Sequence, residues 1–106
     1  MKTTKRKRLE QAGWRVGGVG ELLGLSKEEA VLVEMKLALA RRLRAVRTHR
    51  GLSQAAVAKL LGSSQSRVAK MELGDATVSI DLMVRSLLTI GASRRDIARA
   101  IAQRAA

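Results

Sequence analysis

The stretch 51–74, GLSQAAVAKLLGSSQSRVAKMELG, constrains the fold more than any other part of this chain. Its two apolar-periodic runs, residues 54–61 and 65–73, have the length of short helices. A serine precedes each run and a glycine follows it, in the order Ser53, Gly62, Ser64 and Gly74. Serine is a preferred N-cap, and glycine readily takes the left-handed backbone that ends a helix. The pattern therefore predicts two short helices joined by a tight turn.

The second predicted helix has one apolar side and one polar side. Val68 and Met71 lie three residues apart, so they share the inward face. The opposite face carries an amide, a hydroxyl, a small side chain and a cation, from Gln65, Ser66, Ala69 and Lys70. These groups suit base edges in the DNA major groove, where glutamine pairs with adenine and lysine with guanine. These polar residues alone do not identify a DNA-binding helix, because any surface helix exposes polar side chains. The spacing of the small and apolar residues is what favours a helix-turn-helix: Val57, Ala58, Leu61, Val68 and Met71.

These residues carry a resemblance to the lambda-repressor-like (Cro/cI, or XRE) family of bacterial and phage helix-turn-helix regulators. The matching positions are Arg47, 51–54 (GLSQ), Ala58, 61–62 (LG), 64–66 (SQS), Val68, Glu72 and Gly74. The resemblance covers roughly residues 37–91 and departs at Ser63, where the family usually has an apolar turn residue. It implies an all-α, five-helix DNA-binding domain with the motif at 53–73. It also implies an ion pair between Arg47 and Glu72, which would join the first helix of that domain to the recognition helix.

Composition restricts the function classes that fit the chain. The 106 residues make one small domain with a formal net charge of +12, from 21 Lys+Arg against 9 Asp+Glu, which favours a polyanionic partner. There is no cysteine and the only histidine is His49, so we expect no enzyme, no metal site and no cofactor. We also expect no membrane span, because no apolar run approaches about 20 residues. A cytoplasmic location is compatible with the lack of cysteine. RNA binding is disfavoured, because one Trp without Phe or Tyr offers little for base stacking.

Residues 1–25 are predicted to form a basic arm followed by a glycine-rich docking segment. The arm carries a run of cations that would track phosphates or enter a minor groove, namely Lys5, Arg6, Lys7 and Arg8. A solvated charge run is the alternative interpretation. Trp14, the only aromatic residue, is expected to dock this segment on the helical body, and a partner anchor is its alternative role.

Residues 26–106 are predicted to form the helical domain. Ser26 and Glu29 make a capping box that starts an extended first helix running toward Arg50. Its apolar positions at helical spacing are Val31, Leu32, Met35, Leu39, Leu43 and Val46. After the motif, Ser79 caps a helix that reaches toward Gly91, and Ser93 with Asp96 caps a last helix ending near Gln103. The apolar stripe of this last helix is Ile97, Ala98 and Ile101, which we divide between core and dimer interface.

The functional prediction is a sequence-specific double-stranded DNA-binding regulator, a repressor that acts as a homodimer on a palindromic operator. Base reading is assigned to Gln65, Ser66 and Lys70. Phosphate contacts and bracing are assigned to Gln54, Ser64, Arg67 and Arg50, with Gln54 also bracing Gln65.

A second interpretation belongs to a different class. The long leading helix and the two motif helices also resemble the antitoxin halves of toxin–antitoxin pairs. In that case the chain would repress its own operon and neutralise a toxin protein. The segment around Trp14 and the acidic face over 28–34 would then contact the toxin.

Overall fold

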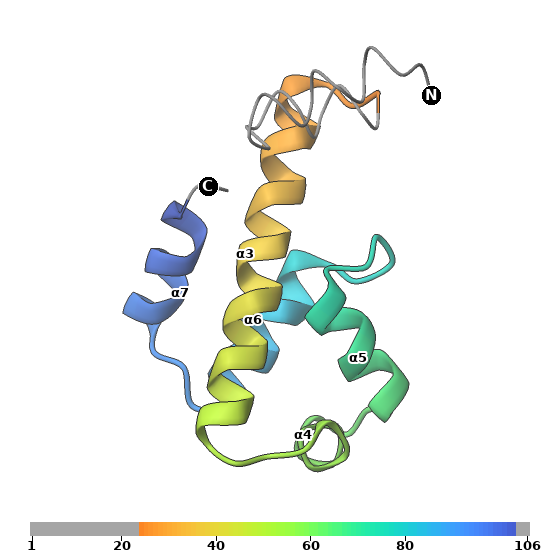
Figure 1. The fold of residues 1–106 in the computed structure, drawn as a ribbon, viewed down its shortest axis with the longest axis vertical. Coiled ribbons are helices and arrows are strands. Elements are labelled where there is room, and N and C mark those ends of the chain that lie inside the picture. The colour runs from red at the N-terminus through yellow and green to blue at the C-terminus, as the bar shows by residue number, and fades with distance from the viewer. Residues whose placement is uncertain (1–23, 104–106) are drawn as a thin grey trace.

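The computed structural model describes residues 24–103, and within them the chain forms helices and no strand. The helices are α3 (Lys27–His49), α4 (Gln54–Leu61), α5 (Gln65–Leu73), α6 (Ile80–Thr89) and α7 (Arg94–Ala102). The long α3 is the central element, with α5 and α7 on its opposite sides and α4 near its C-terminal end (Figure 1). The predicted all-α class and the order of five helices are confirmed.

Each of these helices begins at a serine N-cap. The five caps, Ser26, Ser53, Ser64, Ser79 and Ser93, all have extended backbone and accept a bond from the backbone N–H three residues on. Glu29 and Asp96 complete capping boxes at the starts of α3 and α7, as predicted. A cap of this kind stabilises its helix by about 1 kcal/mol, which matters most for helices as short as α4 and α5.

The turn between α4 and α5 depends on a left-handed glycine. Gly62 has φ 64° and ends α4. The next residue, Ser63, donates its backbone N–H to the carbonyl of Ala58 at 2.8 Å. Both features are typical of a glycine C-cap, so the turn closes through its backbone even with a serine in place of an apolar residue.

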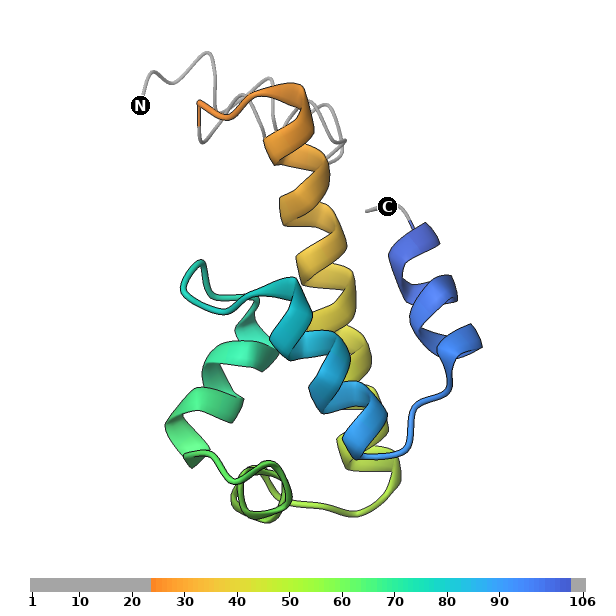
Figure 2. The same ribbon diagram turned by 180° about the vertical axis from the view of Figure 1, so that it is seen from behind.

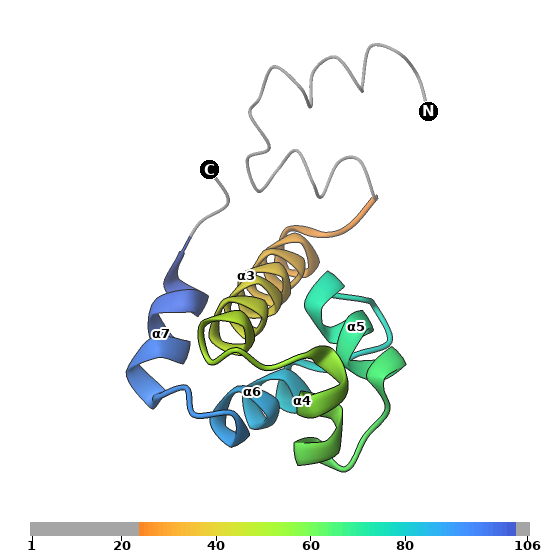
Figure 3. The same cartoon turned by 60° about the horizontal axis from the view of Figure 1, so that its bottom comes forward.

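The core lies where α3 meets the other helices. Leu39 and Leu43 of α3 are fully buried. Buried residues from each of the other described helices pack around them: Val57 and Ala58, Val68 and Met71, Met83 and Leu87, and Ile97 and Ala100. Seen from below, α4, α5 and α6 surround the C-terminal half of α3 (Figure 3). The view from behind shows α6 crossing α3 beside α5 (Figure 2). The α5 helix, predicted to be the recognition helix, is therefore fixed by its own apolar face against α3 and α4.

Of the two apolar faces predicted on α3 and α7, the one at the start of α3 is partly wrong. Val31 and Leu32 were expected to pack, but they are 41% and 51% exposed, because the first turns of α3 extend beyond α4, α5 and α6 (Figure 1). On α7, Ile97 is buried and Ile101 packs against the core, which confirms the part of this apolar stripe that was assigned to the core; its share in a dimer interface stays a prediction. No helix among residues 24–103 is long and apolar enough to cross a membrane.

Candidate nucleic-acid interface

The α5 helix presents a polar face that no other part of the described chain covers. Val68 and Met71 are 0% exposed and hold the opposite face in the core. Gln65, Ser66 and Lys70 are all exposed. The structure thus brings the three predicted base-reading residues together on one accessible surface of a short, firmly packed helix, while Ala69 between them is half-buried.

A shallow groove runs beside this face. It has a volume of about 330 Å³ and lies between α5 and the loop that follows it. Its lining consists of Ser64, Ser66, Arg67, Lys70, Thr77 and Val78. Two cations and several hydroxyls in one groove are donors suited to phosphate oxygens. Two of the residues predicted to contact phosphate, Ser64 and Arg67, therefore lie next to the residues predicted to read bases.

The loop after α5 contributes a site residue that the sequence analysis missed. Thr77 donates from its backbone N–H and its hydroxyl to Asp75 Oδ1, at 2.8 and 2.6 Å. These bonds from Thr77, aided by nearby Lys70 and Lys36, hold the pKa of Asp75 below its usual value. Lys36 of α3 also donates to the carbonyl of Ala76. The D-x-T spacing is the signal that could have predicted this turn, which places Thr77 in the groove.

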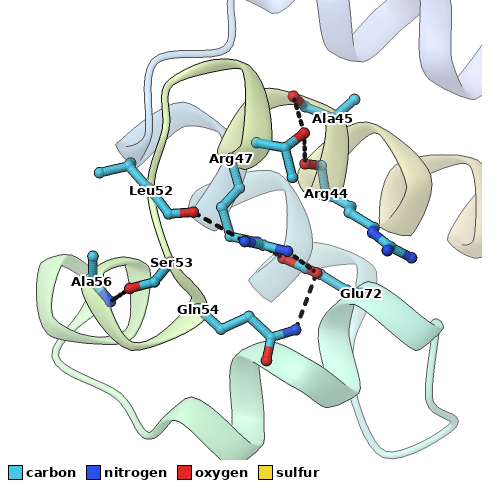
Figure 4. Close-up of polar contacts among 9 residues, drawn as sticks. Arg44, Ala45, Arg47, Leu52, Ser53, Gln54, Ala56 and Glu72 are labelled. Atoms are coloured by element: carbon cyan, nitrogen blue, oxygen red, sulfur yellow. Dashed lines mark hydrogen bonds and ion pairs between the residues drawn. The ribbon is translucent and has the colours of Figure 1, made fainter.

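The C-terminal end of α5 is tied to α3 by the expected ion pair. Arg47 donates from Nε to Glu72 Oε2 at 2.5 Å and from Nη2 to Oε1 at 3.0 Å (Figure 4). Its third nitrogen, Nη1, donates to the carbonyl of Leu52 at 2.9 Å. The two side chains are only 13% and 5% exposed, and the hydrogen bond to Glu72 raises the pKa of Arg47. One guanidinium therefore joins α3, the α3–α4 loop and the recognition helix.

Gln54, the first residue of α4, also joins this cluster. Its amide nitrogen donates to Glu72 Oε1 at 3.2 Å (Figure 4). In this structure the amide binds the buried carboxylate at the other end of α5, and the bracing of Gln65 by Gln54 stays a prediction. The contact links the start of α4 to the end of α5, which fixes the angle between the two motif helices.

Arg50, which was assigned to phosphate contact or bracing, binds the end of α6 in this structure. Its Nη1 donates to the carbonyl of Ile90, at the end of α6, so this guanidinium lies away from the exposed face of α5. His49 lines the same region beside Gly91 and Ala92. The predicted arm residues, Lys5, Arg6, Lys7 and Arg8, and Trp14 lie outside the described residues, as does nearly all of the predicted segment 1–25.

Comparison with known proteins identifies the domain that contains this interface. Residues 38–100 match a family model described as a helix-turn-helix domain. The match begins within α3, ends within α7, and covers more than half of the 106 residues. No curated protein and no solved structure matches the chain.

Proposed function

The chain belongs to the helix-turn-helix domain family, of the XRE/Cro-like kind, and on that premise we propose that it is a sequence-specific double-stranded DNA-binding repressor. The observation that carries this proposal is the exposed face of α5, where Gln65, Ser66 and Lys70 stand clear of a buried apolar face. An α-helix fits the major groove, and these side chains match the donors and acceptors of base edges there.

Contacts to the DNA backbone would orient this face. Arg67 and the Ser64 hydroxyl line the groove beside α5, where a phosphate would be within reach of both. The N-terminus of α4, with Gln54 at its first position, offers a second phosphate contact. The basic arm, with Lys5 to Arg8, would add salt-sensitive affinity.

A homodimer would place two copies of α5 on one side of the duplex. Two-fold pairing that sets the recognition helices about 34 Å apart matches a palindromic operator with half-sites one turn apart. Repression would follow from occupancy of a promoter by the bound dimer. Sedimentation of the free protein and of its operator complex measures the stoichiometry, and one protomer per duplex would contradict the dimer.

The defining experiment is selection from a randomised duplex library, followed by sequencing, at two salt concentrations. We expect a palindromic motif whose affinity falls steeply with added salt. Salt-sensitive binding without an enriched motif would contradict sequence-specific recognition, because it would show that the net charge of +12 acts nonspecifically.

Variants of the exposed face then test the base-reading residues. We expect Gln65→Ala or Lys70→Ala to weaken operator binding by about 1–3 kcal/mol and to relax the preference at one base pair. Lys27→Ala is the matched control, because it removes an exposed lysine in the first turn of α3, far from α5 (Figure 1). Equal weakening on operator and random duplexes would contradict the assignment of base reading.

A further inference from the structure

A second groove is lined by residues of α3, of α7 and of the loop before α7. The α7 helix itself lies on the side of α3 opposite α5 (Figure 3). The groove consists of two adjoining hollows of about 350 and 760 Å³. Both hollows are lined by Arg42, Ala45 and Asp96, so these residues mark the middle of a continuous seam. The seam follows α3 from Ala38 to Arg50, a length of about 18 Å at the rise of an α-helix.

The walls of the α3–α7 groove carry far more positive than negative charge. Four arginines line it, Arg41, Arg42, Arg50 and Arg99, against one carboxylate, Asp96. The groove beside α5 has only two cations, Arg67 and Lys70, in its lining. A cluster of positive charge therefore lies away from the exposed face of α5.

The floor of this groove is apolar and made of small side chains. Ala38 and Ala100 are buried at the contact between α3 and α7, and Ala45, Val46 and Ala92 continue the floor toward the loop before α7. Small residues keep the space between the two helices unfilled. A ligand in it would meet apolar contacts below and guanidinium groups along the rim.

The single carboxylate shows what these arginines bind. Asp96 Oδ1 lies 3.3 Å from Nη2 of Arg42 and 3.3 Å from Nη2 of Arg99. Asp96 also accepts the backbone N–H of Ser93 in the capping box, so it has partners besides Arg42. The Nε of Arg42 is buried and has no hydrogen-bond partner within the described structure. Because this atom is closed to solvent and the whole side chain is 41% exposed, a second carboxylate would reach the outer guanidinium nitrogens of Arg42.

We propose that the α3–α7 groove binds an acidic, partly apolar segment of a partner protein in extended conformation. An extended chain advances about 3.3 Å per residue, so the seam fits roughly five residues. Carboxylates of the segment pair with the rim arginines, which favour bidentate contacts, and its apolar residues cover the alanine floor. The groove is separate from the DNA-reading face, so the inference does not depend on the identity of the operator.

The shape of the groove favours such a peptide over a nucleic acid. A duplex presents its phosphates on a broad convex surface, whereas the Arg42 guanidinium lies within a recessed seam. Single strands bind by stacking successive bases on aromatic side chains, whereas residues 24–103 contain no Phe, Trp or Tyr and the groove offers one imidazole, that of His49. A peptide chain is narrow enough to bring its carboxylates into the recessed groove, and its binding does not depend on base stacking.

The test uses a fluorescein-labelled peptide of alternating glutamate and leucine, with a glutamine-for-glutamate peptide as its uncharged match. Binding to the full chain is followed by fluorescence anisotropy, and the site by backbone amide shifts. We expect the acidic peptide alone to bind, with shifts confined to 38–50 and 91–103. Shifts centred on α5, or equal binding of the glutamine peptide, would overturn the proposal.

Two matched variants separate the groove from the overall charge. Arg99→Gln and Arg85→Gln each remove an exposed arginine that pairs with an aspartate on its own helix. We expect Arg99→Gln to weaken peptide binding about tenfold, which corresponds to about 1.4 kcal/mol, and Arg85→Gln to have little effect. Equal losses would overturn the proposal, as would competition by an oligothymidine. Operator binding is measured on the same variants, so failure of the peptide with an intact operator complex refutes this inference alone.

Discussion

Two arginines of α3 bind carboxylates on its opposite sides, and the two ion pairs differ in burial. Arg47 and Glu72, which join α3 to α5, are 13% and 5% exposed and share two hydrogen bonds. Arg42 and Asp96, which join α3 to α7, are 41% and 25% exposed and lie 3.3 Å apart. An arginine–carboxylate pair thus fixes α5 on one side of α3. The pair of the same chemical groups on the other side leaves Arg42 partly accessible to solvent.

The difference arises from what surrounds each pair. Arg47 is enclosed by the α3–α4 loop, by Gln54 and by the end of α5, so its donors are directed to carbonyl and carboxylate oxygens. Arg42 stands above a floor of alanines and faces solvent through the groove. Buried pairs cost much when one partner is lost, whereas exposed pairs contribute little to stability. The buried pair therefore holds α5 firmly on α3. The exposed pair on the α7 side can exchange its carboxylate for another one at a lower cost in stability.

Removing the carboxylate of the buried pair should have the largest effect. We expect Glu72→Ala to lower the free energy of unfolding by about 3–5 kcal/mol, because Arg47 is left buried without its counter-charge. Chemical denaturation measures this value. Asp81→Ala is the control, because its pair with Arg85 is about three-quarters exposed on both sides and should matter little. Similar losses in the two variants would show that burial does not distinguish these pairs.

The end of α5 offers a second way to test how firmly this helix is held. Gly62 and Gly74 both have left-handed backbone, so an alanine at either costs about 1–2 kcal/mol in strain. A Cβ at Gly74 would also lie 2.9 Å from Leu37 Cδ2, whereas a Cβ at Gly62 meets nothing within 4 Å. We therefore expect Gly74→Ala to lower the unfolding free energy more than Gly62→Ala. Equal values from urea denaturation would contradict close packing of α5 on α3.

The smallest effect on the free energy of unfolding should come from acid titration of Asp96, in the more exposed pair with Arg42. The bond from the Ser93 backbone, aided by Arg42 and Arg99, holds the pKa of Asp96 below 3.8. A depressed folded-state pKa gives stability that is present above the unfolded value near 3.8 and is lost as the pH falls through the folded value. We expect Asp96→Asn to be slightly less stable than the unaltered chain at neutral pH. The two unfolding curves should converge in strong acid, and a gap that widens there would contradict this linkage.

Local signals made much of the fold predictable. Each serine cap and each left-handed glycine acts within about four residues, so Ser53, Gly62, Ser64 and Gly74 mark the motif without knowledge of the tertiary structure. The inward position of Val68 and Met71 follows from helical spacing in the same way. The residues of the candidate interface on α5 could be named for this reason, because its exposed face is the complement of a periodic apolar one.

Contacts between distant segments were less predictable. Periodicity identifies an apolar face but cannot say whether another helix reaches it, which is why Val31 and Leu32 were misjudged. The partners of Gln54 and Arg50 depend on where α5 and α6 end in space, and their side chains are long enough to reach several acceptors. The α3–α7 groove depends on the approach of helices about 50 residues apart, for which no local signal exists.

The uninterrupted α3 has a thermodynamic consequence. Arg42 and Arg47 are five residues apart on one 23-residue helix, about 7.5 Å along its axis. A rotation or tilt of α3 would displace its contacts with α5 and with α7 together, because Arg47 and Arg42 belong to the same continuous helix. Under the two proposals made above, linkage is reciprocal: a peptide that changes operator affinity by some factor would have its own affinity changed by the operator by that same factor. In that case α3 would be the element through which the proposed peptide groove and the proposed DNA-reading face affect one another.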